Sequence, residues 1–206
     1  SFMQPFVLSP YSSNSLNSLP GFLKEQGYHT SFFHGAANGS MGFQSLSNLV
    51  GIDHYFGKNE YNNDTDFDGI WGIWDEPFFQ FMKTKLDEKK KPFMATLFSL
   101  SSHNPYIVPD KYKDKFPKGN LEIHKCVAYT DYSLKQFFNQ AKNEPWFNNT
   151  IFIMVADHCN YVYYDEYMKP VNRFAIPILI YKPNSNLKGI DHHFAQQIDI
   201  YPTILD

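Results

Sequence analysis

The sequence predicts an α/β fold in which a mostly parallel β-sheet is covered by helices on both faces. Three observations lead to this prediction. Short apolar segments of strand length alternate with longer segments in which apolar residues recur at helical spacing. Two of the short segments, 92–100 and 151–156, are almost continuously apolar, which is typical of parallel strands buried on both faces. No repeat or linker divides the 206 residues, so we expect a single domain.

Composition places the chain among globular proteins, because 43% of its residues are hydrophobic and 18% are aromatic. The net charge of −3 gives no electrostatic basis for binding nucleic acid, and the triplet Lys89-Lys90-Lys91 is expected at a solvated helix end. Cys126 and Cys159 are too few for a disulfide framework. No apolar run approaches the roughly 18 residues of a membrane-spanning helix, and no signal peptide is expected in this stretch.

The first fifty residues predict a loop, a helix, a short strand and a second helix. Residues 1–15 are rich in Ser, Asn and Pro and are expected to form a loop. Leucine and phenylalanine then recur at helical spacing as far as Gly27, a residue type that commonly ends helices. A short strand is expected at 30–33, ending at His34, and a helix at 43–50 follows a glycine-rich turn.

A long polar excursion is expected from 59 to 72, where Asn, Asp and Gly are frequent. Its acidic residues raise the alternative of a calcium site, but the segment lacks the alternating ligands and closing Glu of an EF-hand, so a structural loop is favoured. Trp71 and Trp74 are expected to cover the sheet edge. Asp75 is expected to be the N-cap of the next helix, which should end near 88–91.

The second half of the chain continues the alternation of strands and helices. The segments 92–100 and 151–156 are expected to be the two long buried strands, and a surface loop is expected at 107–124. The remaining expected elements are a helix at 127–141, a strand at 177–181 and a helix at 195–205 that Pro202 interrupts.

Polar residues follow three of the predicted strands directly. His34 ends the first, His103 follows the second, and Asp157 and His158 follow the third. The carboxyl ends of strands in a doubly wound sheet lie on one edge, where ligands collect, so these residues predict a polar site there. A carboxylate beside an imidazole suits Zn²⁺ or Mn²⁺, although an Asp that caps a turn beside a hydrogen-bonded His is the structural alternative for that pair.

The chain also resembles a known family. Six segments match, in order, the lipoteichoic acid synthase group of sulfatase-like proteins, which belongs to the alkaline phosphatase superfamily. The matching segments are Phe33-His34-Gly35, Asp68-Gly69-Ile70-Trp71-Gly72-Ile73-Trp74-Asp75-Glu76, Leu100-Ser101-Ser102-His103-Asn104-Pro105-Tyr106, Tyr129-Thr130-Asp131-Tyr132, Ala156-Asp157-His158 and Gln197-Ile198-Asp199-Ile200-Tyr201-Pro202-Thr203.

The resemblance implies an enzyme that transfers phosphoglycerol, or a similar head group, from a lipid-linked phosphodiester to a cell-envelope glycan or polymer. In the family a metal-bound Thr attacks the phosphodiester and forms a covalent intermediate. Asp157 and His158 resemble metal ligands, with Mn²⁺ the expected ion and Mg²⁺, Zn²⁺ or Ca²⁺ as alternatives. His34 and His103 resemble the histidines that contact the phosphoryl group and are the expected catalytic residues; Asn38 and Met41 complete the expected substrate-binding set.

Two departures from the family pattern qualify these expectations. The nucleophilic Thr and an acidic metal ligand lie, in the family, upstream of anything in this chain, so residues 1–206 are interpreted as the C-terminal portion of one sulfatase-like catalytic domain. A Trp and a phosphate-binding Arg shortly after the first histidine correspond here to Met41 and Phe43. Losing a bidentate arginine leaves the head group open.

The resemblance further implies a membrane-anchored bacterial protein whose catalytic domain lies outside the cytoplasm. Two alternatives stay open. One is a sulfatase, phosphodiesterase or phosphoethanolamine transferase that uses the same site. The other, from a different class, is a non-catalytic relative that binds a glycan or a lipid head group.

Overall fold

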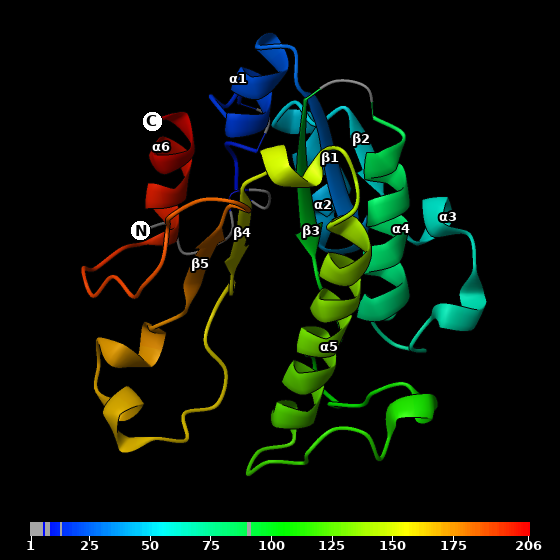
Figure 1. Cartoon of the computed structure of the whole chain (residues 1–206), viewed down its shortest axis with the longest axis vertical. Helices are drawn as coiled ribbons and strands as arrows, with labels where there is room; N and C mark the ends of the chain where they lie inside the picture. Colours follow the sequence, from blue (N-terminus) through cyan, green and yellow to red (C-terminus); the bar gives the residue numbers. More distant parts are fainter. Residues whose placement is uncertain (1–5, 7–8, 13, 90–91) are drawn as a thin grey trace. The chain divides into compact units, whose positions relative to one another are not determined.

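The computed structural model of the chain describes residues 6, 9–12, 14–89 and 92–206 (Figure 1). Most of the loop predicted at 1–15 therefore lies outside the described residues, as do Lys90 and Lys91. The chain divides into two compact units, Ser1–Ala141 and Lys142–Asp206, and each is described by itself.

The first unit is built on a parallel sheet in which β1 (His29–His34) lies between β2 (His54–Phe56) and β3 (Phe93–Phe98). The predicted parallel arrangement is confirmed for these strands. The long apolar strand β3 is at the edge of this sheet and only partly buried, whereas β1 has four of its six side chains buried. The central strand is therefore the one with the more polar sequence.

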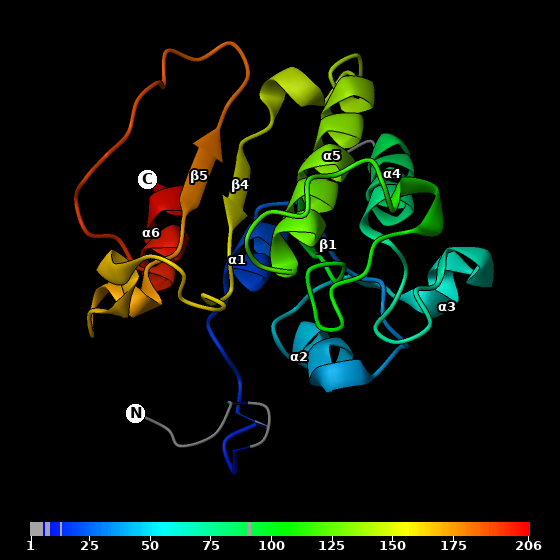
Figure 2. The same ribbon diagram turned by 90° about the horizontal axis from the view of Figure 1, so that it is seen from below.

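Helices cover both faces of this sheet, as predicted. The side chains of β1 alternate, so Phe33 packs against Phe78 and Phe81 of α4 (Asp75–Asp87). Phe32 points the other way and packs against Phe43, the first residue of α2 (Phe43–Leu49). Figure 2 shows α4 and α2 on opposite sides of β1.

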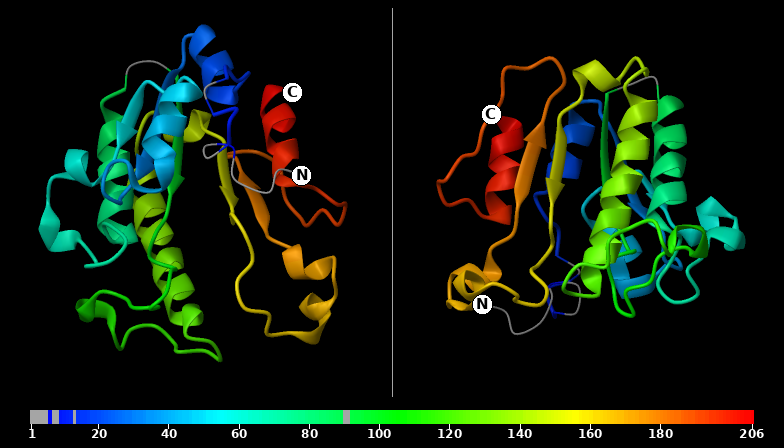
Figure 3. Two further views of the ribbon diagram at one scale, coloured as in Figure 1. Left: turned by 180° about the vertical axis from the view of Figure 1, so that it is seen from behind. Right: turned by 60° about the horizontal axis from the view of Figure 1, so that its bottom comes forward.

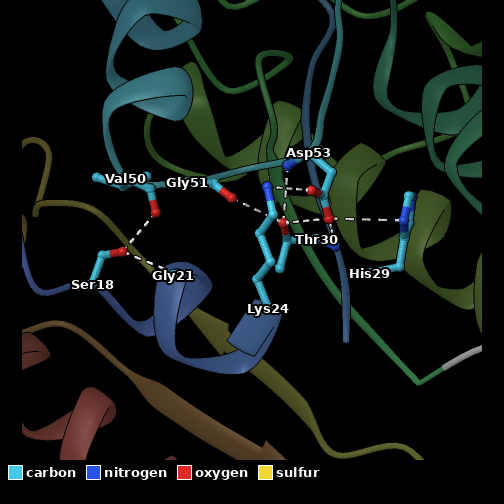
Figure 4. A network of polar contacts seen from close by, with 8 residues as sticks. All are labelled: Ser18, Gly21, Lys24, His29, Thr30, Val50, Gly51 and Asp53. Atoms are coloured by element: carbon cyan, nitrogen blue, oxygen red, sulfur yellow. Dashed lines mark hydrogen bonds and ion pairs between the residues drawn. The ribbon is translucent and has the colours of Figure 1, made fainter. Parts of the chain in front are cut away.

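The amino end of β1 is held by Asp53 (Figure 4). The Asp53 Oδ2 atom accepts hydrogen bonds from the backbone nitrogen of Thr30 at 3.0 Å and from its hydroxyl at 3.1 Å. The ammonium of Lys24 lies 2.6 Å from Asp53 Oδ1. Burial opposes ionisation of Asp53, but the bonds from Lys24 and Thr30 outweigh it and lower its pKa to about 2. This polar network explains how a strand containing Thr30 can occupy the centre of the sheet.

Four predicted helices of the first unit are confirmed, and one short helix was missed. α1 (Leu19–Glu25) begins where the Ser18 hydroxyl accepts from Gly21 N at 3.0 Å, and α5 (Ile123–Ala141) packs along α4. The missed helix, α3 (Lys58–Tyr61), is a single turn inside the segment predicted to be an irregular loop. Its length is below what periodicity can reveal.

The prediction that Asp75 caps α4 is wrong. Trp74 occupies the N-cap position and makes no side-chain capping bond, while Asp75 is the first helical residue. The Asp75 carboxylate is used elsewhere, since it accepts hydrogen bonds from the segment that follows β3. The helix ends at Asp87, close to the expected position.

In the second unit, β4 (Phe152–Val155) pairs with β5 (Ile178–Tyr181) in antiparallel fashion (Figure 3). The expectation that the strand at 151–156 would be parallel is therefore wrong for this pairing. Only short 3₁₀ turns, at Asp165–Met168 and Asn172–Phe174, lie between the two strands. Without a crossover helix the chain returns directly, which gives an antiparallel pair.

The last helix, α6 (Ile200–Leu205), lies beside β5 and follows a 3₁₀ turn at Gln197–Asp199 (Figure 3). A helix was expected here, but the expected interruption at Pro202 is wrong. Pro202 lies in the first turn of α6, where its missing N–H is not needed for a helical hydrogen bond.

Two further features concern the helices and the cysteines among the described residues. None of the helices found there is long and apolar enough to cross a membrane. Cys126 and Cys159 are both free thiols, and Cys126 is buried with its Sγ donating to the Ile107 carbonyl at 3.4 Å.

Candidate active site

His34 and His103 lie at the same edge of the three-stranded sheet. His34 is the last residue of β1 and is fully buried, while His103 follows the neighbouring parallel strand β3. The rings of Phe43 and Phe98 lie edge-on to the His34 imidazole, with centroids 4.8 and 5.7 Å away. Two of the three strand ends that were predicted to carry site residues are therefore brought together within the first unit.

His34 is a neutral imidazole near pH 7. Burial, and then the charge of nearby His103, lower its pKa from 6.5 to about 4. Its Nδ1 atom lies 3.0 Å from the hydroxyl of Tyr55, whose own pKa is raised to about 12 by burial and then by Glu60. His34 Nε2 has no hydrogen-bond partner among the described residues. When the Tyr55 hydroxyl donates to Nδ1, the ring proton is on Nε2, which becomes an unused donor.

The His103 ring is held in place through its Nδ1 atom. Its Nδ1 atom lies 3.0 Å from the carbonyl oxygen of Leu100, which can only accept, so Nδ1 carries a proton. In the neutral ring the lone pair is then on Nε2, which can take up a proton or give it back. The two histidines therefore differ: His34 offers a donor, and His103 offers a group for proton transfer.

Trp71 is a site residue that the sequence analysis assigned only to covering the sheet edge. Its indole lies against the His103 ring with centroids 4.7 Å apart, and its Nε1 donates to the Asn104 carbonyl at 2.6 Å. The side chain is 37% exposed. The only sequence signal was an aromatic residue between Gly69 and Gly72, a spacing typical of a turn that presents a side chain.

The segment carrying Trp71 reaches His103 because two glycine backbones touch. Ile73 N donates to the Gly35 carbonyl at 3.0 Å, and a Cβ atom on Gly72 would lie 2.7 Å from the carbonyl carbon of Gly35. Asp68 Oδ1 organises the turn by accepting from the backbone nitrogens of Ile70, Trp71 and Gly72 at 2.8 to 3.0 Å. This oxygen is used by N–H donors, which supports the structural interpretation of the loop over the calcium alternative.

The other two expected substrate-binding residues lie in the turn after β1. Asn38 Nδ2 donates to both carboxylate oxygens of Glu60 at 3.0 Å, so its amide holds the start of α3. Met41 has a φ of 53° and is 60% exposed. The neighbouring Phe43 packs on His34, and the sequence contains a single arginine, Arg173. The surroundings of His34 in the first unit therefore contain no arginine.

In the second unit, Asp157 and His158 follow β4 and point toward one another. Asp157 Oδ2 lies 3.3 Å from His158 Nε2, and the two side chains are 53% and 68% exposed. Two donor atoms about 2.1 Å from one tetrahedral ion are about 3.4 Å apart, so the pair fits two positions around a divalent cation. Gln197 fixes the turn by donating to the carbonyls of Ala156 at 2.8 Å and Asp157 at 3.0 Å.

Asp157 and His158 supply only part of the ligands that a metal ion needs. Across the described part of the chain, no group of three or more His, Cys, Asp and Glu residues is arranged to hold a metal ion. Cys159 follows the pair directly, but its thiol donates to the Arg173 carbonyl at 2.6 Å.

Comparison with known sequences identifies relatives along the whole chain. The sequence profile of the family named Sulfatase matches residues 2–206. Lipoteichoic acid synthase 2 from Bacillus subtilis strain 168 is 26% identical over 216 residues, which cover 94% of this chain and 32% of that protein. The chain thus spans about a third of the length of this curated relative.

Solved structures with the same fold include two bacterial proteins. A protein in the alkaline phosphatase superfamily from Vibrio parahaemolyticus superposes with a TM-score of 0.83 at 32% identity, covering 98% of this chain and 50% of that one. The lipoteichoic acid synthase LtaP from Listeria monocytogenes superposes with a TM-score of 0.74 at 21% identity, covering 87% and 49%.

Proposed function

Because the chain belongs to the sulfatase family, with the α/β fold of the alkaline phosphatase superfamily that the sequence predicted, we propose that it is part of a phosphoglycerol-type transferase. The enzyme would move phosphoglycerol or a similar head group from a lipid-linked phosphodiester to a cell-envelope glycan or polymer. Similarity to lipoteichoic acid synthases supports this class. The observation that carries the proposal is the buried, neutral His34 beside His103 at the carboxyl edge of the sheet.

In this proposal His34 binds the phosphoryl group. A neutral ring with its proton on Nε2 donates to an anionic oxygen, and the surrounding rings of Phe43 and Phe98 exclude water from the bond. Hydrogen bonds to developing charge are worth most in such a dry, fixed environment. Tyr55 sets the tautomer by donating to Nδ1.

His103 is proposed to move the proton of the leaving or attacking oxygen. Its Nδ1 proton is committed to the Leu100 carbonyl, so Nε2 is the atom available for exchange. Trp71 covers one face of the ring and limits its rotation. General acid–base catalysis by a positioned histidine contributes roughly 10²- to 10⁴-fold.

Asp157 and His158 are proposed to hold a divalent cation together with ligands from outside this chain. Mn²⁺ is the expected ion, and Mg²⁺, Zn²⁺ and Ca²⁺ are the alternatives. Such an ion supplies positive charge to the nucleophile and the phosphoryl oxygens. The nucleophile, proposed to be a Thr that forms the covalent intermediate, also lies outside this chain.

The proposed setting is the outer face of a bacterial cell membrane, where the lipid-linked donor is present. A membrane-anchored parent protein would bring this domain to that surface. Met41 is proposed to contact the head group through its exposed side chain. Asn38 is proposed to contribute by holding the same turn against Glu60.

The residue at position 43 admits a second candidate, an esterase or transferase with another anionic substrate. Since Phe43 stands where the family has a phosphate-binding arginine, the anion would meet the neutral His34 and not a bidentate cation. A singly charged ester suits such surroundings, and sulfate esters and phosphoethanolamine diesters share this property with phosphoglycerol diesters. A sulfatase, phosphodiesterase or phosphoethanolamine transferase is therefore the alternative to be tested.

The test compares turnover of the full-length protein with that of its His103→Ala variant, using a glycerophospholipid, a chromogenic phosphodiester and a chromogenic sulfate ester with Mn²⁺ present. We expect kcat to fall by about 10²- to 10⁴-fold with metal content unchanged. The matched control is His54→Ala, which removes an exposed histidine from β2.

The possible outcomes lead to different conclusions. Loss of head-group transfer from the glycerophospholipid supports the transferase class. Activity limited to hydrolysis of the chromogenic phosphodiester supports a phosphodiesterase, and preference for the sulfate ester supports a sulfatase. Wild-type turnover that survives His103→Ala within twofold would remove His103 from the mechanism. A folded, metal-loaded wild type without turnover of any donor would favour the non-catalytic binding module.

A further inference from the structure

Asp75 is a buried carboxylate whose hydrogen bonds all go to other elements. It is 2% exposed, although it is the first residue of α4. Its Oδ1 atom accepts from the backbone nitrogens of Leu100 at 3.0 Å and Ser101 at 3.2 Å. Its Oδ2 atom accepts from the hydroxyl of Thr130 in α5 at 2.7 Å. A single side chain therefore joins the start of α4, the end of β3 and the middle of α5.

Leu100 connects Asp75 to His103. Its backbone nitrogen donates to Asp75 Oδ1 at 3.0 Å, and its carbonyl oxygen lies 3.0 Å from His103 Nδ1. Leu100 is therefore held by the Asp75 carboxylate through its N–H group. Its carbonyl oxygen in turn holds the His103 imidazole. The direction of the Leu100 carbonyl determines which ring nitrogen of His103 carries the proton.

The contacts of Asp75 exceed what the helix requires. A surface Ser or Asp at the N-cap would stabilise the start of α4 without burying a charge. Here burial raises the pKa of Asp75, against the hydrogen bonds from Thr130, Leu100 and Ser101, which lower it. The backbone nitrogen of Asp75 also donates to Ser101 Oγ at 3.0 Å, so the connection to the end of β3 runs in both directions.

We propose that Asp75 is a positioning residue for His103, which it holds through Leu100 in the tautomer with Nδ1 protonated and Nε2 available. The catalytic part of this inference rests on the proposed function of His103, whereas the tautomer can be measured without turnover. Removing the carboxylate leaves the N–H groups of Leu100 and Ser101 without their acceptor, so the segment turns toward water. The Leu100 carbonyl then no longer fixes the His103 ring.

The effect on catalysis follows from geometry. A displacement of about 1 Å at a catalytic group costs on the order of 10²-fold in rate. We therefore expect Asp75→Ala in the full-length protein to lower kcat by about 10- to 100-fold while KM stays within about twofold. Asp75→Asn should restore most of the rate, because its amide oxygen still accepts from both backbone nitrogens and its NH₂ can donate to Thr130 Oγ1.

The direct test is the ¹⁵N NMR signal of the His103 ring in the full-length protein labelled with ¹⁵N-histidine, assigned with His103→Gln. Wild type and Asp75→Asn should show a protonated Nδ1 and an unprotonated Nε2 in the neutral ring. Asp75→Ala should show a mixture of both tautomers. If Asp75→Ala does not fold, Asp75→Ser takes its place, since its hydroxyl is too short to accept from both nitrogens, and the same mixture is expected.

The matched control is Asp53→Ala, which removes a partly exposed polar network at the opposite end of β1. It should destabilise the protein without changing the His103 tautomer, and this separates positioning from stability. An unchanged His103 signal in folded Asp75→Ala or Asp75→Ser would overturn the positioning role. A mixed signal with undiminished turnover would instead leave the positioning intact and contradict the proposed role of His103.

Discussion

At the residue scale, His34 has a property that can be measured without any substrate. Its imidazole is fully buried, Tyr55 lies within hydrogen-bond distance, and nearby His103 acts on its charge. Because its pKa in the folded protein is about 4 and that of an ordinary histidine is 6.5, the unfolded chain binds the proton more tightly. Folding therefore favours the neutral ring.

The expected result is a loss of stability on mild acidification. The stability contributed by neutral His34 is fully present above pH 6.5 and is lost as pH falls toward 4. The shift corresponds to about 3 kcal/mol. Urea unfolding at pH 7 and pH 4 should show this loss in the wild type and a smaller loss in His34→Gln. Equal losses in both proteins would mean that His34 is not the group responsible.

Asp53 titrates in a separate range, which keeps the experiment interpretable. Its pKa is lowered to about 2, so the stability that it contributes is present above its ordinary value of 3.8 and is lost only as pH falls toward 2. The two groups lie at opposite ends of β1, and each should lower the free energy of unfolding over its own pH range.

At the element scale, the contact between Gly72 and Gly35 decides whether Trp71 reaches His103. A Cβ atom at Gly72 would lie 2.5 Å from Leu100 Cδ1 and 2.7 Å from the Gly35 backbone. The loop would have to move away from the end of β1.

We expect Gly72→Ala to lower the free energy of unfolding by about 1 to 3 kcal/mol, as overpacking does, and to separate Trp71 from His103. Gly69→Ala is the control, because its φ of 88° is unfavourable for alanine but no atom lies within 4 Å of the added Cβ. It should cost about 1 kcal/mol and leave the Trp71 contact in place. Denaturant unfolding and tryptophan fluorescence measure both effects; fluorescence changes of equal size in the two variants would contradict the role of the Gly72 contact.

Elements with a clear periodic pattern were predictable from sequence, whereas pairing and short elements were not. Helix α5 has enough turns for its apolar face to be evident, but β2 has three residues and α3 has four. The direction of β4 depended on the connection to β5, whose irregular course is not encoded as a repeating pattern. Strand direction is therefore decided by tertiary structure rather than by the apolar run itself.

The candidate site was likewise predictable only in part. His34 and His103 were predictable because each follows a strand, and parallel strands end at one edge. The contacts of Trp71 with His103 and of Asp75 with Leu100 join residues 32 and 25 positions apart, and no spacing rule relates them. Asp75 was assigned to helix capping because its sequence context is the same in either role.

At the scale of the whole molecule, the predicted phosphoryl-binding residues and the predicted metal ligands belong to different compact units. His34 and His103 are in the first unit, and Asp157 and His158 are in the second. Metal binding and phosphoryl binding should therefore be separable by mutation in the full-length protein.

We expect Asp157→Ala to lower the divalent metal content, measured by elemental analysis after dialysis, because it removes one of two donors 3.3 Å apart. His34→Gln should retain the metal of the wild type while losing turnover. Equal metal content in Asp157→Ala and the wild type would remove this pair from the metal site. Restoration of activity by excess Mn²⁺ in Asp157→Ala would show that affinity, and not the fold, was changed.

The alternation of side chains along β1 has a consequence for how the protein can evolve. Thr30 and His34 lie four positions apart and so project to the same face, where Thr30 is fixed by Asp53 and His34 meets Phe43. Insertion or deletion of one residue between them would exchange His34 with a neighbour and turn the imidazole toward α4. Substitutions around His34 can therefore change its surroundings while leaving it in place, whereas a length change within the strand moves the imidazole itself.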